Sequence, residues 1–140
     1  MKKLYIIAIL FCFFLSNISC MATNYYDRYG NKTRSYKSDS SGDVTSYDKY
    51  GAKKESYKKT SAGYNSYDKY GSQIGSYKKT DNGYDAYDKY GNKTGSYQAT
   101  SQGVVVHYDK YGNKVGSFKK NASGKIIQYD KYGRKIGSYK

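Results

Sequence analysis

Apolar and small or polar side chains alternate in short runs along residues 24–140, and no run has helical spacing. In an extended chain, Gly116 and Phe118 lie on one face, and Val115 and Ser117 lie on the other. The same arrangement returns at residues 136–139. Polar segments that end in glycine separate the runs about every ten residues, a spacing typical of hairpin turns. The pattern therefore predicts an all-β chain folded as a meander of β-hairpins.

The runs belong to a tandem repeat built around Tyr-Asp-Lys-Tyr-Gly. Its aspartate occurs at positions 27, 48, 68, 88, 109 and 130, so the period is 20 or 21 residues. A period of this length indicates a repeat architecture, in which each unit buries its face only by stacking on its neighbours. We expect residues 23–140 to form one domain of six tandem β-hairpins, a meander that can close into a flower- or propeller-like ring.

The turn of each repeat has its own chemistry. In residues 88–91, aspartate stands at the first position of the turn and glycine at the fourth, which suits a type I turn closing a three-residue hairpin loop. We expect the repeat aspartates to cap these turns. Each is followed by Lys or Arg, which does not favour a calcium site, so we predict no metal and no cofactor.

The interior must be built mainly from tyrosine. After Ala22 the chain has no Cys, Leu, Trp or Pro, and its 20 Tyr accompany a single Phe. Without cysteine, disulfides and thiol chemistry are excluded from this part of the chain. Tyrosine rings bury large areas, but each hydroxyl needs a hydrogen-bond partner.

The first 22 residues have the layout of a secretory signal peptide. Lys2 and Lys3 precede an apolar run from Leu4 to Leu15, which is too short to cross a bilayer as a helix. Two cleavage sites fit. A lipoprotein-type cut would leave a lipidated Cys20 at the new N-terminus, and an ordinary cut would follow Ala22. Both predict an exported protein, secreted, periplasmic or on the cell surface.

The exported part is strongly basic. Without Lys2 and Lys3, 23 of the 25 Lys and Arg remain against 11 acidic residues, a net charge of +12. This balance favours attraction to polyanions.

One set of repeat residues is a candidate binding surface, because the second tyrosine of the motif follows a cation in every unit. The tyrosines are Tyr29, Tyr50, Tyr70, Tyr90, Tyr111 and Tyr132, and the lysines before the last five are Lys49, Lys69, Lys89, Lys110 and Lys131. All occupy the same turn position, so they line one end of the sheet, one pair about every 10 Å. Aromatic faces beside cations suit sugars or single-stranded nucleic acid. The alternative is that the rings only cover neighbouring turns and lysine stems.

The sequence contains few residues that could support catalysis. His107 is the only histidine, and no recurring partner makes it a base. We expect it to be an ordinary strand residue on the face opposite Val104, Val106 and Tyr108. No serine or threonine has an activating neighbour, so we predict that the protein is not an enzyme.

The stretch Asp130-Lys-Tyr-Gly-Arg-Lys-Ile-Gly-Ser-Tyr139, echoed from Asp109 and Asp88, resembles the repeat of small exported bacterial β-flower proteins. That resemblance covers residues 24–140 and implies β-hairpins around a pseudo-rotational axis, with no enzyme activity. The spacing Gly-x(4–5)-Tyr-Asp-x-x-Gly is also similar, more weakly, to YD-repeat (Rhs-like) shells.

Two functions are compatible with these observations. The first is a non-enzymatic, exported binding module for a glycan or anionic polymer of the cell envelope or a host surface. The second is a structural, self-associating coat or envelope protein, because similar strands without proline can pair edge to edge. The sequence contains no specific nucleic-acid motif.

Overall fold

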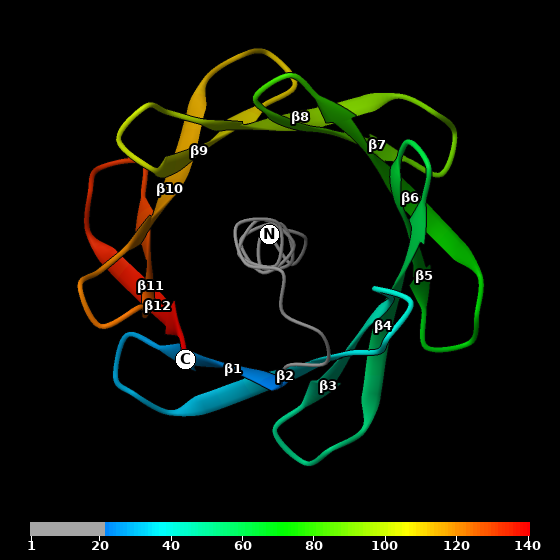
Figure 1. Ribbon diagram of the computed structural model, residues 1–140, viewed down its shortest axis with the longest axis horizontal. Helices are drawn as coiled ribbons and strands as arrows, with labels where there is room; N and C mark the ends of the chain where they lie inside the picture. The colour runs from blue at the N-terminus through cyan, green and yellow to red at the C-terminus, as the bar shows by residue number, and fades with distance from the viewer. Residues whose placement is uncertain (1–21) are drawn as a thin grey trace.

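The computed structural model describes residues 22–140, and these residues form twelve β-strands. The strands are β1 (Ala22–Asp27), β2 (Lys32–Ser38), β3 (Val44–Asp48), β4 (Lys53–Thr60), β5 (Gly63–Asp68), β6 (Gln73–Thr80), β7 (Gly83–Asp88), β8 (Lys93–Ala99), β9 (Val104–Asp109), β10 (Lys114–Lys120), β11 (Ile126–Asp130) and β12 (Lys135–Tyr139). Each strand pairs antiparallel with the next, and the strands follow one another around a ring in chain order (Figure 1). The predicted meander of hairpins is confirmed.

The ring is closed by the first and last strands. Tyr25 pairs with Tyr139 in antiparallel register, and Asn24 and Lys140 exchange two backbone hydrogen bonds of 2.9 and 3.0 Å. Closure leaves no strand edge in the sheet of the described residues. None of residues 22–140 belongs to a helix that could span a membrane.

The two repeat lengths arise from the loops that join one hairpin to the next. Where the period is 21, three residues lie between the last two hydrogen-bonded residues of the loop, and the third of them is a glycine with positive φ: Gly42, Gly103 or Gly124. Where it is 20, Thr60 pairs with Gly63 and Thr80 with Gly83, so only two residues separate the strands. The missing residue is therefore taken from a loop, and the alternation of inward and outward side chains continues.

Every hairpin also contains one β-bulge. In the second hairpin Ser46 pairs with Glu55 and Tyr47 pairs with Lys53, which leaves Lys54 unpaired. The corresponding residues of the other hairpins are Thr33, Ile74, Thr94, Val115 and Ile136. A bulge bends its strand and increases the local twist. Six of them help to curve the sheet into a ring.

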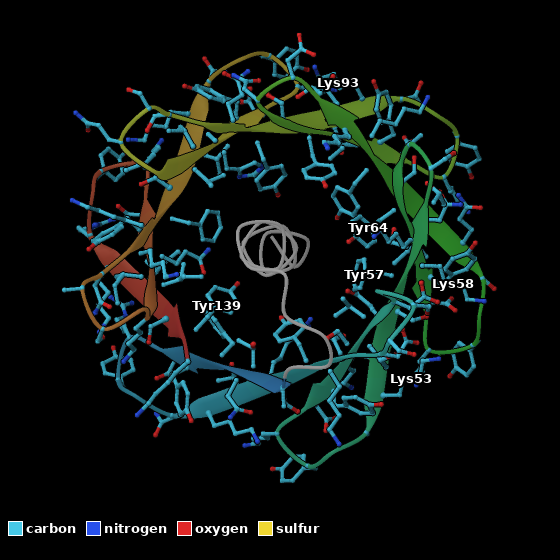
Figure 2. The ribbon with its side chains drawn as sticks, viewed as in Figure 1. Lys53, Tyr57, Lys58, Tyr64, Lys93 and Tyr139 are labelled. Carbon is cyan, nitrogen blue, oxygen red and sulfur yellow. The ribbon has the colours of Figure 1, made fainter. Side chains whose placement is uncertain are left out.

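Tyrosine rings form most of the inner wall, as the composition predicts. The buried core consists of Tyr25, Tyr36, Val44, Tyr57, Tyr64, Tyr77, Tyr84, Ala86, Tyr97, Val105, Phe118, Ile126 and Tyr139. Figure 2 shows Tyr57, Tyr64 and Tyr139 inside the ring and Lys53, Lys58 and Lys93 outside it. Rings on neighbouring hairpins meet in tilted pairs, such as Tyr25 with Tyr139 at 4.8 Å between centroids, a geometry that aromatic pairs favour.

Glycine occupies one inward position in the even-numbered strands of the last four repeats. A Cβ atom on Gly95 would lie 2.5 Å from the carbonyl oxygen of Tyr108, and one on Gly137 would lie 2.1 Å from the hydroxyl oxygen of Tyr25. The first two repeats carry Arg34 and Glu55 at this position instead. Glycine is therefore required where a neighbouring backbone or ring comes close to the strand.

Candidate functional site

Six turns place exposed tyrosines along one rim of the ring. Each turn follows an odd-numbered strand, so all six lie at the same end of the sheet. We call these tyrosines, with the cation that precedes each, the tyrosine rim: Tyr29, Tyr50, Tyr70, Tyr90, Tyr111 and Tyr132 after Arg28, Lys49, Lys69, Lys89, Lys110 and Lys131. The tyrosine side chains are 72–83% exposed. The expected placement of these residues along one end of the sheet is thus found.

The repeat aspartate fixes the backbone beneath each tyrosine. In the fifth turn, Oδ1 of Asp109 accepts hydrogen bonds from the backbone N–H groups of Tyr111 and Asn113, at 2.8 and 2.9 Å. The backbone N–H of Gly112 donates to the Asp109 carbonyl at 3.1 Å, and Gly112 has a φ of 85°. The other five turns repeat this pattern. The predicted capping role of the aspartates is confirmed.

These hydrogen bonds favour the ionised form of Asp109 and Asp27. The side-chain amide and backbone N–H of Asn113 lower the pKa of Asp109, and the backbone N–H of Asn31 lowers the pKa of Asp27. Hydrogen bonds to a carboxylate favour its ionised form. Each carboxylate therefore accepts its hydrogen bonds from within its own turn.

Every rim tyrosine lies under the cation that precedes it in the chain. The lysine Nζ atoms of the last five turns are 4.7–4.9 Å from the centroid of the following ring, and Cζ of Arg28 is 5.3 Å from that of Tyr29. These distances are typical of cation–π interactions, each of which contributes about 0.5–1 kcal/mol at an exposed site. The arrangement fixes the charge next to the aromatic face.

A second cation follows in five of the six turns. Two residues after the turn glycine stand Lys32, Lys53, Lys93, Lys114 and Lys135, and only the third turn has Gln73 there. Lys93 forms an ion pair of 2.9 Å with Asp85 on the outer wall. The rim thus contains more cations than aspartates, and its net formal charge is positive.

A second row of lysine–tyrosine pairs, which was not predicted from the sequence, lies on the outer wall. Nζ of Lys58 is 5.4 Å from the ring centroid of Tyr67, and Nζ of Lys78 is 4.9 Å from that of Tyr87. Lys37 and Tyr47 form the equivalent pair in the preceding repeat. The available signal was a lysine directly after the inward aromatic, which lies diagonally across from the tyrosine before the next aspartate.

The structure also shows where the remaining candidate residues lie. His107 is 8% exposed and lies on the inner wall. Val104, Val106 and Tyr108 lie on the other face of the strand, as expected. Within residues 22–140, no three His, Cys, Asp or Glu side chains are grouped so that they could hold a metal ion. Cys20 lies outside the described residues.

Comparison with known proteins adds no relative. No family model matches this chain, and the search of curated proteins finds no significant match. The function must therefore be inferred from the residues themselves.

Proposed function

We propose that this protein is a non-enzymatic, exported binding module whose tyrosine rim holds a glycan or another anionic polymer. One observation carries the proposal: six tyrosines, each 72–83% exposed, recur at one rim with a cation fixed over every ring. Large aromatic side chains are normally buried, so an ordered series of exposed ones is informative.

The chemistry of the rim favours an anionic polymer with flat apolar faces. An exposed tyrosine ring offers an apolar surface and a hydroxyl, which together suit a sugar ring. The adjacent lysine attracts carboxylate, sulfate or phosphate groups. Because the carboxylate of each repeat aspartate accepts hydrogen bonds within its own turn, it offers little competition for the lysine.

Repetition adds a further argument. Pairs that recur about every 10 Å around a rim can each contact a successive unit of a polymer. Weak individual contacts then combine, since each later contact forms at the high effective concentration set by the first. A repeating ligand would therefore be held far more tightly than a single sugar at any one turn.

Export rests on the signal-peptide layout of the first 22 residues. The resemblance to β-flower proteins supports the same location and the absence of catalysis. The alternative, a self-associating coat protein, relied on strand edges. Because β1 pairs with β12, the described sheet has no edge to offer to a second copy, so the binding module is favoured.

A panel of glycans and polyanions tests the proposal. The full chain is expressed, the exported protein is purified, and binding to heparin, polyglutamate, chitin and cell-wall polysaccharides is measured across a salt series. We expect one class of glycan to stay bound at about 0.5 M salt, where simple charge attraction is screened. If binding to every polyanion were lost equally at that salt concentration, the binding would be non-specific charge attraction, and the proposal would be contradicted.

Matched variants separate rim chemistry from net charge. The triple change Lys69→Gln, Lys89→Gln and Lys110→Gln alters the rim. Its control, with the same net charge, changes Lys120, Lys125 and Lys140 to Gln, away from the rim. We expect at least a tenfold weaker affinity for the rim variant alone, and equal effects would contradict the proposal. A rim variant with Tyr70, Tyr90 and Tyr111 changed to Leu tests the aromatic part in the same assay.

A further inference from the structure

A cavity of about 150 Å³ lies against the inner wall between β5 and β9. Small residues make room for it: Gly75 and Gly95 occupy the position where the first two repeats have Arg34 and Glu55. Ala86 contributes only a methyl group to the same wall. These small residues leave space at this part of the inner wall, which is separate from the tyrosine rim.

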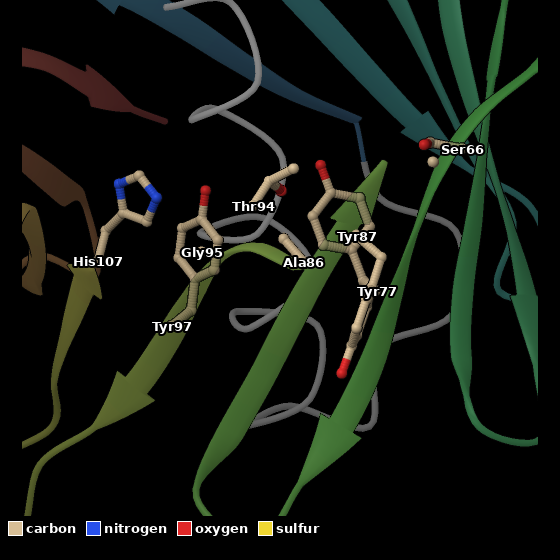
Figure 3. Close-up of a pocket in the computed structure, with 9 residues that line it drawn as sticks. Ser66, Tyr77, Ala86, Tyr87, Thr94, Gly95, Tyr97 and His107 are labelled. Atoms are coloured by element: carbon tan, nitrogen blue, oxygen red, sulfur yellow. The ribbon is translucent and has the colours of Figure 1, made fainter. Parts of the chain in front are cut away.

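Aromatic rings form the sides of this cavity. Tyr97 and His107 lie on adjacent strands with their rings stacked, 4.3 Å between centroids and 14° between planes. Tyr77 lines the cavity from β6. Figure 3 shows the His107 and Tyr97 rings side by side at one end of the cavity and Ser66 at the other. A flat ring placed there would meet aromatic surface and glycine backbone.

One polar atom at the cavity is buried without a hydrogen-bond partner among the described residues. Nδ1 of His107 is buried and makes no hydrogen bond with any of residues 22–140, although the residue is only 8% exposed. Buried polar groups are almost always hydrogen-bonded, because leaving one unpaired is costly. A hydrogen-bonding occupant would remove this cost.

The groups around the cavity are uncharged at neutral pH. Burial lowers the pKa of His107 to about 4, and burial raises the pKa of Tyr97 well above its ordinary value. A neutral imidazole has one donor and one acceptor nitrogen, and a phenol can donate or accept. These groups match the hydroxyls of a neutral molecule, whereas an ion here would lose its hydration without gaining a countercharge.

We propose that this cavity binds one neutral, hydroxylated six-membered ring, a monosaccharide unit, between Tyr77, Tyr97 and His107. A cavity of this volume is similar to those that admit a single benzene-sized ring. The ring would pack against the aromatic side chains, and its hydroxyls would bond to the imidazole and to the Ser66 hydroxyl. This site does not depend on the tyrosine rim.

The single histidine of the chain provides a direct readout. The full chain is expressed with labelled histidine, the exported protein is purified, and the imidazole signals of His107 are followed by NMR. D-glucose, D-galactose and N-acetyl-D-glucosamine are titrated separately. We expect a saturable shift with at least one of them, with a dissociation constant of about 1 mM. D-glucuronic acid, which differs from glucose by a carboxylate, should bind at least tenfold more weakly.

Three results would overturn the proposal. These are no saturable shift with any neutral sugar, equal binding of glucuronic acid, and binding of phenol in place of the sugars. Equal binding of glucuronic acid would show that the cavity does not select a neutral ligand, and binding of phenol would assign the cavity to an aromatic ring.

Variants place the ligand in the cavity. Ala86→Val adds two methyl groups to the wall and retains the histidine signal. We expect at least tenfold weaker binding, and unchanged binding would contradict the site. If this variant does not fold, His107→Gln replaces it, since Gln128 occupies the equivalent position of the next repeat; binding is then read by saturation transfer to the sugar. Tyr70→Leu on the rim is the control, with unchanged affinity expected.

Discussion

The inner wall and the tyrosine rim are both built from tyrosine, but the side chains are buried in the first and exposed to solvent in the second. Core tyrosines such as Tyr36 and Tyr57 are at most 6% exposed, whereas the rim tyrosines are at least 72% exposed. Burial raises the pKa of inner tyrosines, including Tyr64, because a phenolate would be poorly solvated there. The difference shows that the repeat stabilises the ring with one set of phenol rings and presents another set to solvent.

The position of each tyrosine relative to its turn determines which set it joins. Along an even-numbered strand, period-two alternation directs Tyr97 inward together with Gly95. In the turn, the hydrogen bonds from the backbone to Asp88 hold Tyr90 outside both faces of the sheet. One short motif therefore specifies both regions, and changes at equivalent tyrosines should have very different consequences.

The largest expected contrast compares two tyrosines of the last repeat. Tyr139→Ala removes a ring that is 1% exposed and contacts Tyr25 across the closure of the sheet. We expect it to lower the free energy of unfolding by about 4 kcal/mol. Tyr132→Ala, at a side chain that is 72% exposed, should cost about 1 kcal/mol from the lost cation–π contacts with Lys131 and Arg134. Urea denaturation measures both, and equal losses would contradict the division into two regions.

The second contrast is in the response to acid. The folded-state pKa of His107 is about 4, below the 6.5 of an unperturbed histidine, because burial disfavours the imidazolium. The unfolded chain then binds the proton more tightly, so stability is complete above pH 6.5 and falls as the pH drops toward 4. The full change is about 3 kcal/mol.

Denaturation at a series of pH values, with His107→Gln as the control, checks this dependence. The control should be flat between pH 6.5 and 4. Asp109 responds in a lower range: hydrogen bonds depress its pKa below 3.8, so its contribution is lost only as the pH falls below that value. A wild-type curve that is flat down to pH 4 would exclude the burial of a neutral His107.

The smallest contrast concerns two glycines of the fourth repeat. Gly95→Ala on the inner wall would place a methyl group 2.5 Å from a backbone carbonyl. We expect a loss of about 2–3 kcal/mol, because the backbone must move. Gly91→Ala in the rim turn meets nothing within 4 Å but has a φ of 87°, so about 1 kcal/mol is expected. Thermal unfolding compares the two, and a larger loss at Gly91 would reverse the proposed order.

Much of the local structure could be predicted from the sequence because its causes are local. Asp-Lys-Tyr-Gly encodes the turn through the aspartate side chain and the positive φ of glycine, and both are found. The alternation of Gly116 and Phe118 with Val115 and Ser117 gives the inner and outer faces. The tyrosine core follows from the near absence of other large apolar residues. The rim, as a set of exposed turn residues, was predictable for the same reason.

Ring closure and the cavity were harder to predict from the sequence, because they depend on residues that are far apart along the chain. The pairing of Tyr25 with Tyr139 joins strands separated by almost the whole chain, and nothing local encodes it. The stacking of His107 on Tyr97 requires the register between β8 and β9, which depends on the loop length after β8. His107 therefore resembled an ordinary strand residue, although its side chain lines the cavity.

Because Asn24 and Lys140 are hydrogen-bonded neighbours, the order of the repeats along the gene is not essential to the ring. A circularly permuted chain, with residues 24 and 140 joined by a short linker and new ends opened in any inter-hairpin loop, would contain the same pairings. Such permutants would allow a fusion partner or a fluorescent label to be attached at any chosen point of the circumference.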